Sequence, residues 1–309
     1  MNAVALAIDL GGTKIEAALV DPSGVVLAGT RFRAPTGRES SSEQLVASAD
    51  SVVTQALATI PDATTLVGVG IGSAGPITVD RGLVSPLNLP NWRDFPLRDH
   101  VASLVPGVPV TLRMDGECIT MAEHWVGAGQ GVDNLMGMVV STGIGGGLIL
   151  GGMAVAGPTG NAGHIGHVEV GGFDEACLCG GTGCVEAVAS GPNTVRWARS
   201  QGWVGETGED LAASYAAGDE IAIAAVRRSG RAIGQAIASA TALVDLDVVA
   251  VGGGFSHVAP DLLDMVREAI AKRAPFAFVA KVRVIPSGLS GEGPLIGAAA
   301  LVHRADLVA

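Results

Sequence analysis

One feature above all limits how this chain can fold: an apolar segment, a glycine-containing turn and a second apolar segment occur in the same order twice. Residues 3–20 are apolar on both sides of Gly-Gly-Thr-Lys at 11–14, and residues 136–150 are apolar on both sides of a glycine run at 142–147. Apolar runs of this length bounded by turn residues are typical of buried strands. The repetition predicts two related halves, each with a mixed β-sheet covered by helices.

Helical patterns lie between and after these strands. Ser40 and Glu43 have the spacing of a capping box, and apolar residues from Leu45 to Ile60 recur every three or four positions, which predicts an amphipathic helix. The Ala-rich segment 219–243 is also expected to be helical. The remaining expected elements are strands at 25–28, 66–71, 108–114 and 247–251, a hairpin over 77–84, a helix opened by Gly116, and a closing helix at 293–303.

The composition indicates a folded chain with an acidic surface. Hydrophobic residues make up 48% of the 309 residues and charged residues only 16%, which excludes a disordered chain. The formal net charge of −11 repels phosphate backbones and anionic lipids, so no nucleic-acid or membrane partner is expected. The charge-free stretch 135–168 contains eleven glycines, and we interpret it as strands and turns rather than a membrane span. The first residues include no basic segment, so we expect a cytoplasmic protein.

The segment 70–75, Gly-Ile-Gly-Ser-Ala-Gly, matches the dinucleotide-binding pattern G-x-G-x-x-G. In that motif the turn opens a helix whose N-terminus faces a pyrophosphate. Here Pro76 follows at once, and 77–84 has the pattern of a hairpin. We therefore expect a glycine turn against a ligand or a neighbouring strand, not a nicotinamide site.

The turn at 9–14, Asp-Leu-Gly-Gly-Thr-Lys, has the composition of a phosphate-binding segment. Its glycines let backbone N–H groups approach an anion, Thr13 and Lys14 add a hydroxyl and a positive charge, and Asp9 can orient Mg²⁺ through water. A plain hairpin turn would have a similar sequence. Two further glycine segments follow strands, and the three together suit a nucleotide held between two domains. The expected nucleotide-binding residues are Asp9, Gly11, Gly12, Thr13, Lys14, Thr142, Gly143, Gly252, Gly253 and Gly254.

Four residues near the middle of the chain form a metal-binding pattern: His167, Cys177, Cys179 and Cys184. One imidazole and three thiolates suit tetrahedral Zn²⁺, and glycines between the last two cysteines permit a tight wrap around the ion. Because protein ligands would fill all four positions, the zinc is expected to be structural. The alternative is a cluster of free buried cysteines.

Together, the segments 9–14, 141–147 and 163–186 resemble the ROK family (repressor, open reading frame, kinase). The string Cys-x-Cys-Gly-x-x-Gly-Cys-x-Glu over 177–186 is highly specific to that family, and the resemblance extends from Ala7 to Ala300. It implies an α/β fold of the actin-like ATPase (ribonuclease H-like) type, with two domains of mixed sheets and flanking helices and with ATP in the cleft between them. The implied domains are residues 1–116 plus 293–309, and residues 117–292, which carry the zinc loop and the adenosine site.

The resemblance also implies roles for single residues. Asp115 matches the general base that receives the proton of the sugar's 6-hydroxyl, although an aspartate at this position can also simply cap the helix that follows. His167 would serve both as a zinc ligand and as a wall of the sugar site, and Glu186 matches a ligand of the sugar hydroxyls. The implied sugar-binding set is Gly75, Asn88, Met114, Asp115, His164, His167 and Glu186.

Two of these positions depart from the family's pattern. Met114 stands where most family kinases have Asn, and His164 stands where they have Glu. A site that pairs a hydroxyl discriminates strongly against analogues, so these changes are expected to alter which sugar, epimer or anomer is bound. They leave the implied kinase activity intact, because Asp115 and the three nucleotide segments are present.

The resulting hypothesis is an ATP- and Mg²⁺-dependent kinase that phosphorylates the 6-hydroxyl of an N-acetylhexosamine, such as N-acetylglucosamine or N-acetylmannosamine, with glucose as the alternative substrate. The resemblance also implies a homodimer. Two other hypotheses are a sugar-responsive transcriptional regulator and a sugar-binding protein that has lost catalysis. The acidic charge disfavours the regulator, as does a first strand that begins near Ala3 and leaves no room for a helix-turn-helix.

Overall fold

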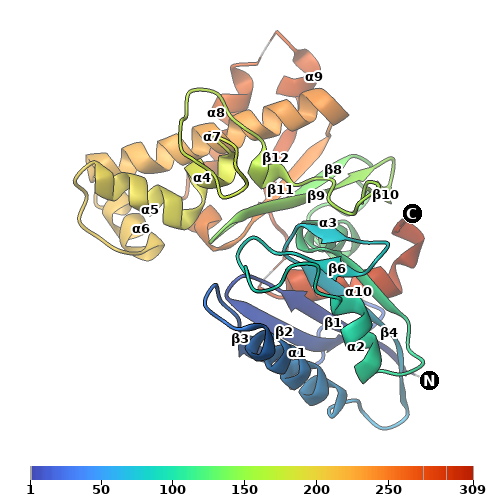
Figure 1. Cartoon of the computed structure of the whole chain (residues 1–309). Coiled ribbons are helices and arrows are strands. Elements are labelled where there is room, and N and C mark those ends of the chain that lie inside the picture. Colours follow the sequence, from blue (N-terminus) through green and yellow to red (C-terminus); the bar gives the residue numbers. More distant parts are fainter. Residues whose placement is uncertain (1, 274, 290, 309) are drawn as a thin grey trace. The chain divides into compact units, whose positions relative to one another are not determined.

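The structure, a computed structural model, describes residues 2–273, 275–289 and 291–308. Its internal contacts divide the chain into two compact units, whose elements are labelled in Figure 1. Unit 1 consists of Met1–Gly131, Gly147–Gly163 and Leu289–Ala309, and unit 2 of Val132–Gly146 and His164–Gly288.

Unit 1 contains a five-stranded mixed sheet with the order β3-β2-β1-β4-β7. Its strands are β1 (Asn2–Leu10), β2 (Lys14–Val20), β3 (Phe32–Pro35), β4 (Thr64–Ser73) and β7 (Val110–Met114). β1 pairs antiparallel with β2 and parallel with β4, and β4 pairs parallel with β7. The carboxyl ends of β1, β4 and β7 therefore meet at one edge of the sheet, the edge where α/β folds bind their ligands.

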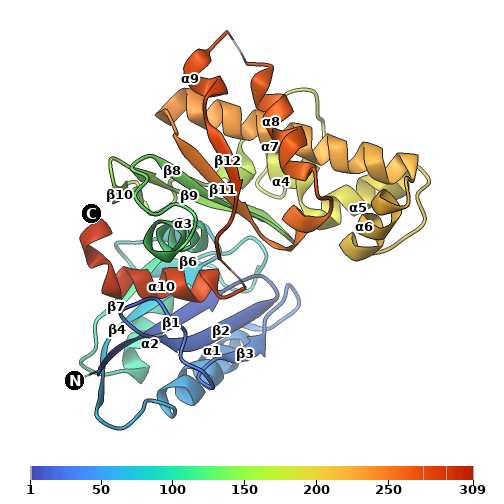
Figure 2. The same cartoon turned by 180° about the vertical axis from the view of Figure 1, so that it is seen from behind.

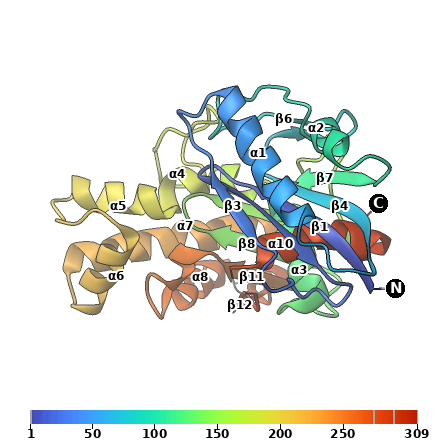
Figure 3. The same ribbon diagram turned by 90° about the horizontal axis from the view of Figure 1, so that it is seen from below.

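Helices cover both faces of this sheet. They are α1 (Ser42–Leu57), α2 (Leu97–Leu104), α3 (Asp115–Val126), α10 (Gly293–His303) and the short η3 (Ala305–Leu307). α1 and α2 share a core with the large residues Leu6 and Ile8 of β1, whereas α10 packs on the small residues Ala5 and Ala7 of the opposite face. Figure 3 shows α1 and α10 on opposite sides of these strands, and Figure 2 shows α10 running beside α3.

Alternate glycines of β4 let α10 and α3 pack closely on this strand. A methyl group on Gly70 would lie 1.8 Å from the carbonyl oxygen of Ala298, and one on Gly72 would lie 3.2 Å from Cys118 Sγ. The glycine turn expected at 70–75 is therefore wrong for most of its length, because β4 continues to Ser73. The glycines leave room for helices rather than for a ligand. β4 leads into the hairpin of β5 (Ile77–Thr78) and β6 (Leu83–Val84), as predicted.

The second sheet has the order β10-β9-β8-β11-β12. Its strands are β8 (Leu135–Val140), β9 (Ile144–Leu150), β10 (Met153–Ala154), β11 (Val248–Gly252) and β12 (Arg283–Pro286). β8, β11 and β12 are parallel neighbours, and β9 and β10 form an antiparallel pair. Strand for strand, this is the chain order of the first sheet, so the predicted pair of related mixed sheets is confirmed.

The helices of unit 2 lie in the sequence between β10 and β11 and between β11 and β12. They are η1 (Ile165–His167), α4 (Val185–Ala189), α5 (Gly191–Ser200), α6 (Gly208–Ala216), α7 (Glu220–Val244), η2 (Gly254–His257), α8 (Leu262–Ala271) and α9 (Ala277–Ala280). α7 is the expected Ala-rich helix, and it lies alongside α8 (Figure 1). Gly234 makes this possible, since a methyl group there would lie 2.5 Å from the carbonyl oxygen of Val266.

Two local predictions are wrong. The strand expected at 25–28 is absent, and β3 forms at 32–35 instead. The Asp21 carboxylate accepts hydrogen bonds from the amides of Ser23 and Val25, which holds the chain in a turn, so this stretch pairs only through an isolated bridge. The capping box of α1 also lies one residue later than expected, at Ser41 and Gln44.

The compact units differ from the expected domains in that residues 117–131, 147–163 and 289–292 belong to unit 1. α3 contributes to this difference because it packs tightly on α10: a methyl group on Gly297 would lie 2.0 Å from the carbonyl oxygen of Cys118. Among the described residues, no helix has the length and apolar character needed to span a membrane, in keeping with the interpretation of 135–168 as strands and turns.

Candidate active site and metal centre

Two aspartates lie at the carboxyl edge of the sheet in unit 1. Asp9 is near the end of β1, and it follows Ala5 and Ala7 on the face that α10 covers. Asp115 is the first residue of α3, directly after β7. Burial, followed by the negative charges of Asp115 and Glu16, raises the pKa of Asp9 to about 7. Such a concentration of buried negative charge favours a cation at this edge of the sheet.

Asp115 is not the cap that its alternative interpretation requires, because Met114 holds the N-cap position of α3 and Asp115 is the first helical residue. The Asp115 carboxylate nevertheless contacts its own helix. Its Oδ1 atom accepts a hydrogen bond of 2.7 Å from the amide of Gly116, in the first turn of α3. This contact orients the side chain at the helix N-terminus, where the partial positive charge of the helix favours a carboxylate. The helix contact and a role as proton acceptor are compatible, because a carboxylate has further acceptor positions.

The glycine turn of unit 1 is closed by a hydrogen bond of 2.9 Å from the amide of Gly11 to the carbonyl of Lys14. Gly12 lies directly against Asn88, since a methyl group on it would be 2.9 Å from Asn88 Cβ. The structure thus brings an expected sugar-binding residue next to the expected phosphate turn. Gly75 is near as well, because the adjacent Ala74 donates its amide hydrogen to the carbonyl of Leu10.

A cluster of charges that was not predicted from the sequence lies beside this turn. The carboxylate of Glu16, 2% exposed, lies 2.5 Å from Lys14 Nζ, 3.0 Å from an Arg31 nitrogen and 2.8 Å from an Arg33 nitrogen. Burial alone would raise the pKa of Glu16, but hydrogen bonds from Lys14 and Arg33 outweigh it and the pKa is lowered. Glu16 therefore faces three cations, and one of them, Arg31, also lies 4.0 Å from the carboxylate of Glu292. Three cations and two carboxylates leave positive charge next to the turn. The available signal was a glutamate within the otherwise apolar run from Ile15 to Val20.

Met114 occupies a different environment from the one expected. Its side chain is 2% exposed and packs in the core that α1 and α2 share with the sheet. A cavity of about 400 Å³ also opens in unit 1, but it adjoins none of the expected site residues. It is lined by Val79, Arg98, Val110, Thr111, Leu112, Arg113, Leu301, Ala305 and Val308.

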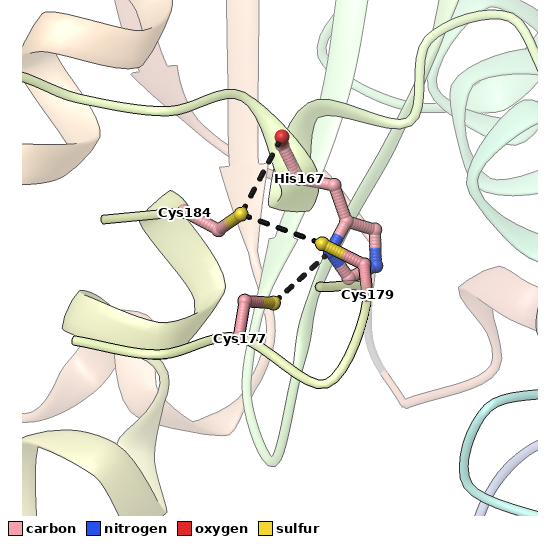
Figure 4. A group of neighbouring side chains, drawn as sticks. All are labelled: His167, Cys177, Cys179 and Cys184. Atoms are coloured by element: carbon pink, nitrogen blue, oxygen red, sulfur yellow. Dashed lines mark hydrogen bonds between the residues drawn. The ribbon is translucent and has the colours of Figure 1, made fainter. Parts of the chain in front are cut away.

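In unit 2, the four expected metal ligands converge (Figure 4). Their ligand atoms all lie within 4.8 Å of one another, with Cys177 Sγ 3.4 Å from His167 Nδ1 and Cys179 Sγ 3.6 Å from Cys184 Sγ. Tetrahedral bonds of about 2.3 Å to sulfur and about 2.1 Å to nitrogen would place sulfurs about 3.8 Å apart and sulfur about 3.6 Å from nitrogen. Both separations are close to these values.

The backbone of the loop explains how the cysteines come together. Gly183 has φ of +72°, and a methyl group on it would lie 2.8 Å from the carbonyl oxygen of Phe173. Only glycine adopts this turn without strain. Burial, followed by the neighbouring thiols, raises the pKa of Cys184 to about 12, whereas a backbone hydrogen bond from Gly181 lowers the pKa of Cys179.

His164 and Glu186 lie on either side of this cluster in the sequence and both approach other site residues. The ring of His164 meets that of His167 edge to face, with centroids 4.7 Å apart. Burial, followed by the neighbouring His167, lowers the pKa of His164 to about 4, so this imidazole is neutral at physiological pH. A neutral imidazole offers a hydroxyl one donor and one acceptor, whereas Glu at this position would only accept.

Residues 168–184, between η1 and α4, carry the three cysteines and are called the metal loop below. Glu186, directly after this loop in α4, connects it with a glycine turn. Its Oε2 atom accepts a hydrogen bond of 2.8 Å from the amide of Ile144, and a methyl group on Gly143 would lie 2.7 Å from the same oxygen. The third glycine segment reaches the same turn, because Gly253 packs on the backbone of Val140. A methyl group on Gly253 would lie 2.5 Å from the carbonyl oxygen of Val140. Thus the residues expected around 142–143 and 252–254 adjoin each other in unit 2.

Comparison with known proteins decides the family. The ROK family model matches residues 5–305. The chain belongs to the ROK family. An N-acetylmannosamine kinase of Yersinia pseudotuberculosis is 37% identical over 252 residues, which cover 80% of this chain and 82% of that protein. A glucokinase of Thermotoga maritima is 30% identical over 316 residues, covering 97% of both chains.

A solved structure supports the fold of this ROK protein. The crystal structure of a ROK family glucokinase from Streptomyces griseus, in complex with glucose and AMPPNP, superposes with a TM-score of 0.81 at 30% identity. The match covers 97% of this chain and 99% of that one. The expected actin-like fold is therefore confirmed.

Proposed function

We propose that this ROK protein transfers the γ-phosphoryl group of ATP to the 6-hydroxyl of a sugar. The observation that carries the proposal is the pair Asp9 and Asp115. Both lie at the carboxyl edge of one sheet, near the end of β1 and directly after β7, beside a glycine turn with surplus positive charge. Phosphoryl transfer requires positioning and neutralisation of charge more than covalent chemistry by the protein. The backbone amides of the glycine turn would position the phosphates, and the buried carboxylates would hold the cation that neutralises their charge.

The roles of the residues follow from this chemistry. As the 6-hydroxyl oxygen attacks the γ-phosphorus, Asp115 accepts the hydroxyl proton, and the bond from the γ-phosphorus to the bridging oxygen breaks to release ADP. Asp9 would hold Mg²⁺ through water, and the ion would neutralise phosphate charge. The glycines of 11–12 and the ammonium of Lys14 would hold the phosphates, with the segments at 142–143 and 252–254 as further nucleotide contacts.

For the sugar we propose an N-acetylhexosamine, N-acetylmannosamine or N-acetylglucosamine. The identity to the Yersinia N-acetylmannosamine kinase supports this choice. A neutral His164 in place of the usual glutamate would change the pairing with sugar hydroxyls. Asn88, Gly75, His167 and Glu186 would complete the sugar contacts. The glucokinases of Thermotoga and Streptomyces support glucose as the alternative substrate.

We also propose a structural zinc ion held by His167 Nδ1 and the sulfurs of Cys177, Cys179 and Cys184. The ion would cross-link the loop between η1 and α4 and so fix His164 and Glu186. With four protein ligands it would leave no coordination position for a reacting water. The zinc content of the purified protein tests this directly.

A homodimer is the oligomeric state we expect, and light scattering on the purified protein tests it.

A coupled assay with ATP and Mg²⁺ over a panel of sugars tests the proposed activity. The panel contains N-acetylmannosamine, N-acetylglucosamine, mannose and glucose, and the D115N variant serves as the blank. We expect the highest kcat/KM with one of the N-acetylated sugars. Turnover of glucose alone would replace the proposed substrate by the alternative. Absence of turnover with every sugar of the panel would contradict the proposed kinase activity.

A further inference from the structure

A single arginine of α7 connects four segments of unit 2. The Arg228 side chain is 13% exposed, and its Nη1 atom donates a hydrogen bond of 3.0 Å to the carbonyl of Val188 at the end of α4. Its Nη2 atom forms an ion pair with Glu175 in the metal loop. One guanidinium group therefore contacts both the loop that carries the cysteines and the helix that carries Glu186.

Aromatic rings enclose the same guanidinium. The centroid of the Phe173 ring lies 4.9 Å from Arg228 Cζ, and the centroid of the Trp197 ring, on α5, lies 5.3 Å from it. Arg231, one turn further along α7, lies 4.5 Å from the Phe173 ring. Contacts of a guanidinium with aromatic faces are attractive and strengthen when water is excluded.

These contacts reach the metal ligands through the backbone of the loop. The carbonyl of Glu175 accepts a hydrogen bond of 2.8 Å from the amide of Gly183, the residue before Cys184. The carbonyl oxygen of Phe173 is packed against Gly183 as well. Fixing Phe173 and Glu175 on α7 therefore fixes both ends of the segment that contains the three cysteines.

We infer that Arg228 is a positioning residue of the metal centre: it holds residues 173–184 on α7 in the arrangement that the metal requires. The inference rests on the zinc site of the proposed function. Backbone hydrogen bonds join the two arms of this loop to each other, as from the amide of Cys177 to the carbonyl of Gly181, whereas the contacts of Arg228 join the loop to α7. Residues that orient metal ligands from outside the coordination sphere typically change metal affinity by about 10–100-fold when they are replaced.

Two measurements on matched variants test the inference. R228M removes the charge and the forked donors, and R228K keeps the charge but cannot contact Glu175, Val188 and both rings in the same way. R227M is the control for charge, because Arg227 is the exposed neighbour on α7. V226A is the control for stability, because Val226 is buried on the same helix. F173L removes the ring without leaving Glu175 unpaired.

The first measurement is hydrogen exchange of the metal-free protein. We expect faster exchange over 173–184 in R228M than in R227M or V226A, with unchanged exchange in β8 and β11. The second is zinc affinity by competition with a chelator. We expect about 10–100-fold weaker binding by R228M, a smaller loss in R228K and F173L, and no change in the controls. In the sugar assay, R228M should raise the KM for the sugar and leave the KM for ATP unchanged.

Exchange and zinc affinity of R228M equal to those of R227M would overturn the inference. If R228M does not fold, R228K and F173L decide by the same two measurements. If the wild-type protein binds no zinc, the proposed metal centre is wrong. The exchange of the metal-free variants then still shows whether Arg228 holds the loop.

Discussion

Unit 1 and unit 2 hold their functional side chains by different means. In unit 1, Asp9 and Asp115 are at the ends of a strand and a helix, which the packing of α10 on β4 fixes to the core. In unit 2, the expected metal ligands lie on the short η1 and on the loop that follows it, which contains only isolated β-bridges and is joined to α7 by side-chain contacts. The carboxylate site of unit 1 should therefore tolerate removal of metal from unit 2, whereas the metal loop should not.

The largest effect is expected from a change that disables unit 1 alone. D115N keeps the shape of the side chain but removes the proton acceptor. We expect kcat to fall by about 10²–10⁴-fold, with zinc content and unfolding unchanged. The coupled assay and a metal determination measure this. D99N, at an exposed position of α2, is the control and should retain full activity.

A pH dependence of stability should also be specific to unit 1. The pKa of Asp9 is about 7 in the folded chain and 3.8 in a model peptide, so the folded state holds this proton more tightly. The stability it contributes is present below pH 3.8 and is lost as the pH rises through 7. The free energy of unfolding should fall by at most about 4 kcal/mol over this range. Urea unfolding should show this fall in the wild type relative to D9N. Parallel pH profiles of the two proteins would contradict it.

A change in the metal loop should give the opposite pattern. C179S removes one thiolate, and zinc affinity should fall by at least the 10–100-fold typical of residues outside the coordination sphere. In C179S the KM for the sugar should rise more than the KM for ATP. The difference in the pH dependence of stability between chains with Asp9 and chains with D9N should remain when C179S is also present. Chelator competition and steady-state kinetics measure these changes. Equal rises in both KM values would contradict the proposed role of the loop.

The smallest effect concerns packing. G70A places a methyl group 1.8 Å from the carbonyl oxygen of Ala298, so α10 must move. We expect a loss of about 1–3 kcal/mol in the free energy of unfolding. G171A is the control, because no heavy atom lies within 4 Å of its added methyl group. Denaturant unfolding compares the two, and an unchanged midpoint for G70A would contradict the packing role of these glycines.

The sequence predicted what depends on periodicity or on short spacing. Both sheets followed from their apolar runs, and the metal ligands are close in the chain, from His167 to Cys184. The strand predicted at 25–28 was wrong because the Asp21 side chain holds a turn there, and an apolar run does not reveal such a side-chain contact. The contacts of Glu186 with Ile144 and of Arg228 with Glu175 join residues 42 and 53 positions apart, so no local pattern could predict them.

We propose that Asp115 accepts the proton of the sugar hydroxyl. A crystal structure of the protein with N-acetylmannosamine and a non-hydrolysable ATP analogue would test this role. We expect an oxygen of the Asp115 carboxylate about 2.6–3.2 Å from the sugar's O6 atom, with O6 facing the γ-phosphorus. A bound sugar whose O6 atom lies beyond reach of this carboxylate, or pairs with a different base, would contradict it.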